Sequence, residues 1–182
     1  MNCNPRNLPV FQDYHPHDST TIRLGKSRPL SGKVLDGCIV RNASSYDSNS
    51  GQVVPISMLG HSMNAVSIAR GASVTYNFTT TQDGNAVIRT ALIPTQPNDK
   101  GDLRYSVSID GAEPVVYSLK EPYRSERWKK NVLRGQALRE TEATLSAGSH
   151  TITITALDNH IILDQWMLDY KKDRKFYMFP IR

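Results

Sequence analysis

Two consecutive segments decide the fold of this chain, SHTITITALD at residues 149–158 and IILDQWMLD at residues 161–169. In the first segment isoleucine and alanine alternate with threonine, so a strand here has one apolar face and one face of hydroxyl groups. The second segment is almost wholly apolar, and its Asp164 and Gln165 are predicted to form a polar rim. Because only the polar link at 158–160 separates the two segments, they are predicted to form a hairpin.

Short alternating segments recur through the rest of the chain. Further strands are predicted at 35–43, 73–78, 85–93, 105–109, 115–119 and 137–145, with polar loops at 44–51 and 94–101 and a hairpin turn at Asp110-Gly111. At least seven strand signals at short spacing predict an all-β fold, a jelly-roll-like and galactose-binding-like β-sandwich with at most one short helix. The expected core residues are Tyr105, Val107, Ile109, Ile152, Ile154 and Trp166.

Residues 125–136 are the one region where a helix competes with a loop. Trp128, Val132 and Leu133 have roughly helical spacing, and Ser125 is a suitable N-cap. The alternative is a loop that leads into the strand at 137–145.

The first thirty-odd residues differ in composition from the remainder. Prolines are spread through Asn, His, Asp and Ser with few periodic apolar positions, which predicts an extended N-terminal arm or linker at 1–33 and one β-sandwich domain at 34–182. The two cysteines, Cys3 and Cys38, are too few for a disulfide framework or a zinc site. The sequence leaves two alternatives for these cysteines: one disulfide bridge that pins the N-terminal arm, or two free thiols.

The charge balance limits the kinds of partner. The chain carries 22 Lys+Arg against 17 Asp+Glu, and much of the excess lies at 124–139 and 171–182. This excess suits an acidic polysaccharide or a solvated basic surface, and no motif indicates a nucleic acid partner.

No apolar run approaches the roughly 20 residues that span a bilayer, and the N-terminus lacks the layout of a signal peptide. The chain is therefore expected to be soluble, and either cytoplasmic or a mature or excised fragment of an exported protein. In the context of such a parent protein, the expected location is extracellular, periplasmic or at the cell surface.

Carboxylate pairs give no support for hydrolytic activity. Glycoside hydrolysis needs two carboxyl groups about 5 to 9.5 Å apart across the scissile bond. The acids that could pair, Asp158 with Asp164 and Asp99 with Asp102, occur in turns or next to strand ends. We therefore expect them to shape turns rather than to catalyse.

Other catalytic or metal sites are also not expected. His61, Ser62 and Asp110 contain the residue types of a Ser-His-Asp triad, but the strained G-x-S-x-G elbow is absent. His15 and His17 lack a third ligand at fixed spacing, so no metal or other cofactor is predicted.

Sugar binding is the chemistry that the residues favour most. Sugar rings stack their C–H faces on exposed aromatic rings, and Tyr177 and three other aromatics fall in polar segments. The basic side chains beside Trp128 suit a uronate through charge-assisted hydrogen bonds. The candidate carbohydrate-binding residues are Trp128, Tyr123, Arg124, Arg127, Lys129 and Tyr46. The alternative for Trp128 is packing against the edge of the sandwich, and for the basic residues a solvated loop.

Five segments in order resemble the C-terminal β-sandwich domain of glycoside hydrolase family 115, the bacterial xylan α-glucuronidases. They are VPISMLGHSMNAV at 54–66, RYSVSIDG at 104–111, Trp128 with Val132, the G-x-H-T segment with the strands that follow it, and FYMFP at 176–180. The resemblance covers roughly 37–180. It departs from the family pattern at Met63, which replaces a glycine, and in the turn at 157–160.

The resemblance omits the catalytic portion of that family. It therefore implies a non-catalytic accessory domain, which binds glycans or packs and dimerises with a linked glycoside hydrolase. A domain that packs on a neighbour is expected to leave an apolar surface patch bare. The alternative is a free-standing carbohydrate-binding or adhesion module, and a small independent hydrolase is the least favoured interpretation.

Overall fold

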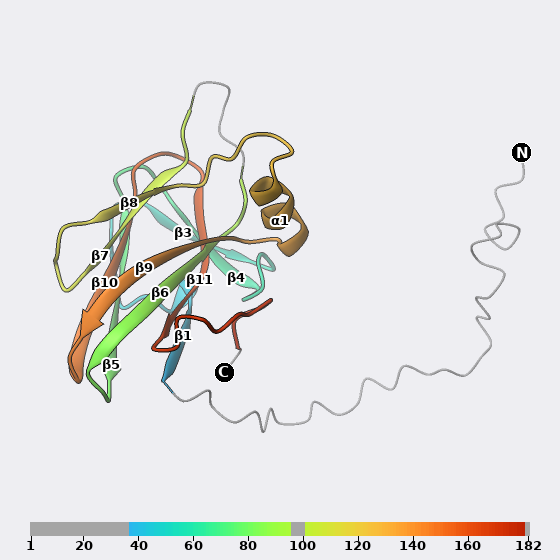
Figure 1. Ribbon diagram of the computed structural model, residues 1–182. Helices are drawn as coiled ribbons and strands as arrows, with labels where there is room; N and C mark the ends of the chain where they lie inside the picture. Colours follow the sequence, from blue (N-terminus) through green and yellow to red (C-terminus); the bar gives the residue numbers. More distant parts are fainter. Residues whose placement is uncertain (1–36, 96–100, 181–182) are drawn as a thin grey trace, which may run out of the picture. The chain divides into compact units, whose positions relative to one another are not determined.

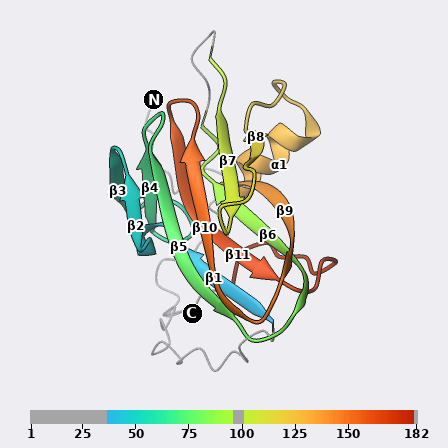
Figure 2. The ribbon, with the colours of Figure 1, turned by 90° about the vertical axis from the view of Figure 1, so that its left-hand side faces the viewer.

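The computed structural model describes residues 37–95 and 101–180 as two antiparallel β-sheets packed face to face (Figure 1). The first sheet has the order β3-β4-β11-β6-β9, and β1 also pairs with β11. Its strands are β1 (Cys38–Asn42), β3 (Val53–Ser57), β4 (Asn64–Ile68), β6 (Gly84–Leu92), β9 (Ala137–Leu145) and β11 (Ile161–Asp169). The second sheet has the order β2-β5-β10-β7-β8 (Figure 2). Its strands are β2 (Ser48–Ser50), β5 (Ser73–Thr80), β7 (Arg104–Ile109), β8 (Val115–Ser118) and β10 (Gly148–Ala156). The predicted β-sandwich is confirmed.

Some predictions concern residues outside the described ranges. The arm at 1–33, Cys3, the pair His15 and His17, and Asp99 all lie there, so they stay predictions. Among the described residues, no helix is both long enough and apolar enough to cross a membrane.

The structure contains three strands that alternation does not reveal, namely β2, β3 and β4. β2 is entirely polar and exposed, and it replaces part of the loop predicted at 44–51, which also holds a short 3₁₀ turn, η3 (Ala43–Ser45). β3 contains Pro55 and pairs only with β4. β2 and β3 each end a sheet, where polar residues and proline are tolerated because one side of the strand makes no ladder bonds.

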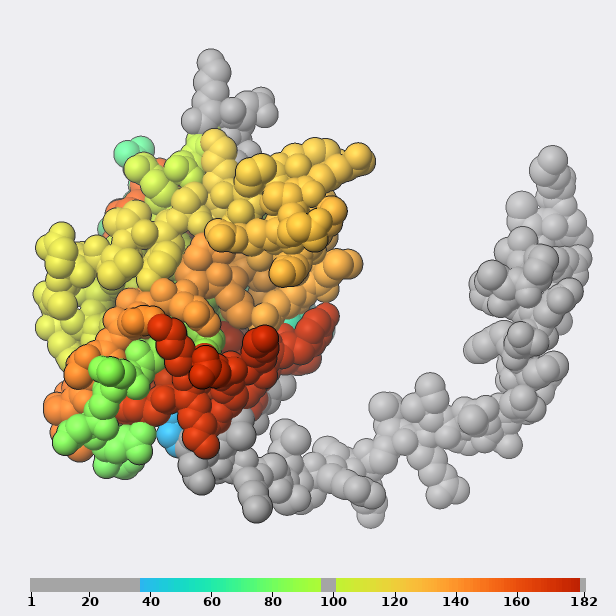
Figure 3. Space-filling view, in the orientation of Figure 1, coloured from blue at the N-terminus to red at the C-terminus, as the bar shows by residue number. Residues whose placement is uncertain are grey.

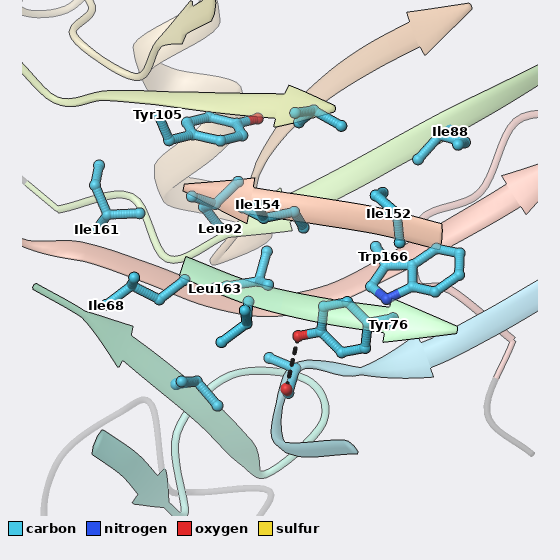
Figure 4. Packing of buried hydrophobic residues seen from close by; sticks show 14 of the residues in the cluster. Ile68, Tyr76, Ile88, Leu92, Tyr105, Ile152, Ile154, Ile161, Leu163 and Trp166 are labelled. Carbon is cyan, nitrogen blue, oxygen red and sulfur yellow. Dashed lines mark hydrogen bonds between the residues drawn. The ribbon is translucent and has the colours of Figure 1, made fainter. Parts of the chain in front are cut away.

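The predicted hairpin of the last two strands is wrong. β10 pairs with β5 and β7 in the second sheet, whereas β11 pairs with β1, β4 and β6 in the first. The link at 158–160 therefore crosses from one sheet to the other. The apolar faces explain the crossing, because Ile154 and Trp166 both point into the space between the sheets and approach it from opposite sides (Figure 4).

The core lies between the two sheets. Of the expected core residues, Tyr105, Val107, Ile152, Ile154 and Trp166 are buried, and Ile109 is half-buried against the same cluster. Trp166 packs edge to face against Tyr76, with ring centroids 5.6 Å apart. The Tyr76 hydroxyl donates to the Ala43 carbonyl at 2.7 Å, so this buried polar group is satisfied (Figure 4).

The outer face of the first sheet is also covered. Met167 and Ala91 form a second apolar cluster with Phe179, so the C-terminal segment lies over this sheet. On the same strand, Gln165 is 1% exposed and donates to Asn42 Oδ1 at 3.1 Å, and Asp164 is fully buried, so the expected polar rim at these two residues is wrong.

A charged pair formed by the buried His150 and the exposed Asp110 joins the β7–β8 turn to β10. The Nδ1 atom of His150 lies 2.7 Å from an oxygen of Asp110, and its Nε2 atom lies 2.8 Å from the Ser146 carbonyl. The bond to Asp110 is the main cause that raises the pKa of His150 above its ordinary 6.5. Burial by itself raises the pKa of Asp110, but bonds from the Thr151 amide and from His150 outweigh it and leave that pKa lowered.

The core assignment predicts the effect of Ile154→Ala. Truncation of this fully buried side chain is expected to lower the free energy of unfolding by about 2–5 kcal/mol, measured by urea denaturation. Val116→Ala on the edge strand β8 is the control, because Val116 is 55% exposed and its loss is expected to cost less than about 0.5 kcal/mol. Equal losses in the two variants would contradict the assignment of the sheet faces.

The charged pair predicts a pH-dependent stability. Because the folded pKa of His150 is raised, its stabilising contribution is complete below its ordinary 6.5 and is lost as pH rises through the folded value. The contribution of Asp110 is present above 3.8 and is lost as pH falls through its lowered pKa. Unfolding followed from about pH 6 to about pH 9 is expected to show falling stability, and a smaller fall in Asp110→Asn. The same slope in both proteins would refute the coupling.

Candidate functional site

Five of the six candidate carbohydrate-binding residues lie in or just before the helix α1 (Glu126–Arg134), which precedes β9. The Ser125 hydroxyl accepts from the Trp128 amide at 3.1 Å and caps the first turn. Gly135 ends the helix in a left-handed conformation, with φ of 70°, and donates to the Val132 carbonyl. Both ends of α1 are therefore set by the local sequence. Of the two alternatives for residues 125–136, the structure contains the helix and not the loop.

Tyr123 and Trp128 form an aromatic corner at the start of α1. Their ring centroids lie 5.2 Å apart at an interplanar angle of 69°, and the guanidinium of Arg124 lies 5.2 Å from the centre of the Tyr123 ring. Tyr123 is 73% exposed. Trp128 is half-buried and lines a narrow crevice with Leu119 and Glu121, so it both packs on the sandwich edge and reaches the surface.

An open groove of about 410 Å³ lies between α1 and the start of β9. Arg127, Lys130 and Arg134 have the i, i+3, i+7 spacing that places them on one face of the helix. We call this the basic groove. It is lined by Arg127, Lys130, Asn131, Arg134, Gln136, Leu138, Arg139 and Glu140.

Two of the cations in the basic groove share a single carboxylate, that of Glu121. Arg139 donates to Glu121 at 2.7 Å and to the Ser118 carbonyl, and Arg127 reaches the same Glu121 at 3.5 Å. Arg134 instead donates from Nη2 to the Phe176 carbonyl at 2.8 Å. Burial lowers the pKa of Arg134 from its ordinary value, yet a guanidinium stays protonated in proteins.

The buried carboxylate of Asp164 organises the hydrogen bonds that hold the C-terminal end of α1, next to the basic groove. Asp164 is fully buried where the β11–β6 register shifts, and it accepts bonds from the His61 and Ser62 amides at 2.8 and 3.1 Å. It also accepts from the Ser62 hydroxyl and from Gln136 Nε2, each at 2.6 Å. His61 Nε2 lies 2.8 Å from the carbonyl of Arg134, so the same loop holds the last turn of α1.

The acids considered for catalysis have structural partners. Asp158 binds Arg104 at 2.9 Å, and Asp102 accepts from Ser118. The notional triad does not form, because His61 and Ser62 bind Asp164 while Asp110 binds His150. Among the described residues, no group of three or more His, Cys, Asp or Glu side chains is placed to hold a metal ion.

The structure brings together only part of the predicted residue set. Tyr46 lies apart from the aromatic corner and packs against the core beside η3. Lys129 pairs with Glu126 at 2.8 Å and does not line the basic groove. Tyr177 lies at the other end of α1, where its hydroxyl donates to the Leu133 carbonyl at 3.4 Å. The groove residues that sequence reasoning missed include Gln136, which precedes β9, and Arg139, which lies in β9. Neither residue belongs to a local sequence motif that would identify it.

This structure and sequence match one protein family over most of the chain. The family model described as the glycosyl hydrolase family 115 C-terminal domain matches residues 37–181. A solved family 115 4-O-methyl-α-glucuronidase with specificity for decorated arabinogalactans is 34% identical over 74% of this chain, with a TM-score of 0.66. This chain spans 18% of the length of that glucuronidase. No curated protein matches the chain.

Two carbohydrate-binding modules have a similar fold at lower identity. A family 35 module from Clostridium thermocellum is 16% identical and has a TM-score of 0.55, with 72% of this chain and 98% of the module covered. The C-terminal family 6 module of a marine laminarinase from Zobellia galactanivorans is 15% identical and has a TM-score of 0.52, with the same coverage of 72% and 98%. At these identities the likeness supports the β-sandwich fold alone.

The Asp164 network predicts that Gly60 tolerates no side chain. Gly60 has φ of 78°, and an added Cβ would overlap with the Asp164 carboxylate. Gly60→Ala is expected to lower the free energy of unfolding by about 3 kcal/mol or more. Gly71→Ala is the matched control, since Gly71 has φ of 80° with open space around it and is expected to cost only the left-handed strain of about 1–2 kcal/mol. Equal costs in the two variants would argue against a tight carboxylate contact.

Proposed function

This chain belongs to the glycosyl hydrolase family 115 C-terminal domains, and from that membership we propose that it binds glycans, including those with uronic acids, as a non-catalytic accessory domain of a carbohydrate-degrading protein. The expected parent is extracellular, periplasmic or located at the cell surface.

The observation that carries the proposal is the surface around α1. The aromatic corner offers the exposed ring of Tyr123 for stacking on the C–H face of a sugar, and the half-buried Trp128 holds that ring in place. The basic groove follows on the same helix, and Asn131 lines both the groove and the crevice beside Trp128. An aromatic platform next to cationic donors matches a glycan that carries acidic groups.

The relatives support a glycan partner. The 34% identical relative acts on decorated arabinogalactans as a 4-O-methyl-α-glucuronidase, so its substrates contain a uronic acid. Two neighbours in fold are carbohydrate-binding modules. The glycans to test are therefore glucuronic-acid-bearing fragments of xylan and of arabinogalactan.

A second role, packing on a linked catalytic part or on a second copy, has its own support. Leu133 is 81% exposed, Tyr177 69% and Met178 43%. The bond from the Tyr177 hydroxyl to the Leu133 carbonyl places the Tyr177 side chain at the C-terminal end of α1, where Leu133 also lies. In Figure 3 the red C-terminal segment lies beside the orange residues of this region. A bare apolar patch of this kind favours an accessory domain over a free-standing module.

The binding role predicts the effect of Tyr123→Ala. Loss of one stacking ring is expected to weaken binding of a glucuronic-acid-bearing xylan or arabinogalactan fragment about 2- to 12-fold in isothermal titration calorimetry. The melting temperature is expected to stay nearly constant because Tyr123 is mostly exposed. Tyr177→Ala removes an equally exposed ring at the far end of the helix and is expected to leave affinity unchanged. If both variants bind like the parent chain, the aromatic corner is not the platform.

The non-catalytic role predicts that the purified chain releases no uronic acid from decorated xylan or arabinogalactan. The reason is that Asp102, Asp158 and Asp164 are each committed to structural hydrogen bonds. Product release is measured by chromatography after prolonged incubation. Turnover that is abolished by Asp158→Asn in a still-folded protein would overturn this assignment.

A further inference from the structure

Two cations of the basic groove lack a carboxylate partner. Among residues 37–95 and 101–180, Lys130 and Arg134 form no ion pair, although both line the groove. The acid that lines the groove, Glu140, is already bound by Arg89 at 2.8 Å. An anion that enters the groove therefore meets positive charge that no carboxylate of the described chain offsets.

The inner end of the groove adds an acceptor and an apolar surface. Gln136 is fully buried, and because its Nε2 donates to the Asp164 carboxylate, the orientation of its amide is fixed. Its Oε1 has no hydrogen-bond partner among the described residues. An acceptor in this place suits a hydroxyl donor, which inorganic anions such as sulfate do not offer. The half-buried Leu138 lines the same groove and suits the C–H face of a sugar ring.

The geometry points to a carboxylate subsite, in which the basic groove takes a uronic acid residue of the bound glycan. The carboxylate lies between Arg134 and Lys130, the ring lies over Leu138, and a ring hydroxyl is directed toward Gln136. The groove volume of about 410 Å³ is in the range of small-molecule sites. This inference rests on the proposed function and adds to it the chemical group recognised and the residues that recognise it, which are separate from the aromatic corner.

Adjacent lysines provide a matched test. Lys130 lines the groove, whereas Lys129 pairs with Glu126 and does not line it. Lys130→Gln is expected to weaken binding of a glucuronic-acid-bearing xylo-oligosaccharide about 3- to 10-fold in calorimetry at low salt, and Lys129→Gln to leave it unchanged. The methyl ester of the same oligosaccharide, which is neutral, is expected to bind more weakly than the acid and to be insensitive to Lys130→Gln.

A second variant separates charge from geometry. Arg134→Lys keeps the charge but removes the planar fork, so it is expected to weaken binding of the acid while the ester is unaffected. Because Arg134 also bonds the Phe176 carbonyl, the melting temperature of this variant is measured alongside.

Three outcomes would overturn the subsite. Equal affinity for acid and ester, with Lys130→Gln without effect, would refute the subsite and leave glycan binding intact. Sulfate that competes with the acid at equal concentration and ionic strength would indicate a general anion site. If neither oligosaccharide binds at millimolar concentration, both the subsite and the proposed function are refuted for these glycans.

Discussion

The arrangement of this domain around its helix depends on the buried carboxylate of Asp164. A carboxylate with no solvent contact is costly unless hydrogen bonds replace its hydration. Here four bonds do so, three from the 61–62 loop and one from Gln136. These bonds join the β3–β4 loop, the start of β9 and the bulge of β11. Through the contact of His61 with Arg134, they also fix the end of α1 and thus one wall of the basic groove.

The strands were predictable where alternation is strong. Val74, Tyr76 and Phe78, or Ile152 and Ile154, bury every second side chain, so period 2 is visible in the sequence. β2 has no apolar residue, and its pairing with β5 gives no local signal. The crossing between β10 and β11 was missed because a three-residue polar link is equally compatible with a hairpin. Which sheet each strand joins is decided by its distant partners.

The surface around α1 was predictable in its location but not in its detail. The helix follows from the cap at Ser125 and the glycine at 135, and the aromatic and basic residues within it were visible in the sequence. Lys129 and Lys130 are adjacent in the sequence but point in different directions from the helix. Lys129 pairs with Glu126, whereas Lys130 lines the basic groove. Gln136 gains its position only from Asp164, a residue 28 positions away, so no local pattern identifies it.

The order in which the strands are paired has a consequence for biosynthesis. β10 and β11 occupy the middle of their sheets, yet they are the last two strands of the domain in chain order. Neither sheet can close around the core until these strands have left the ribosome, because β5 and β7 meet only through β10, and β4 and β6 only through β11. Long-range pairing of this kind slows folding and leaves earlier strand edges open for longer. Nascent chains of this domain thus keep strand edges unpaired until β11 has been synthesised.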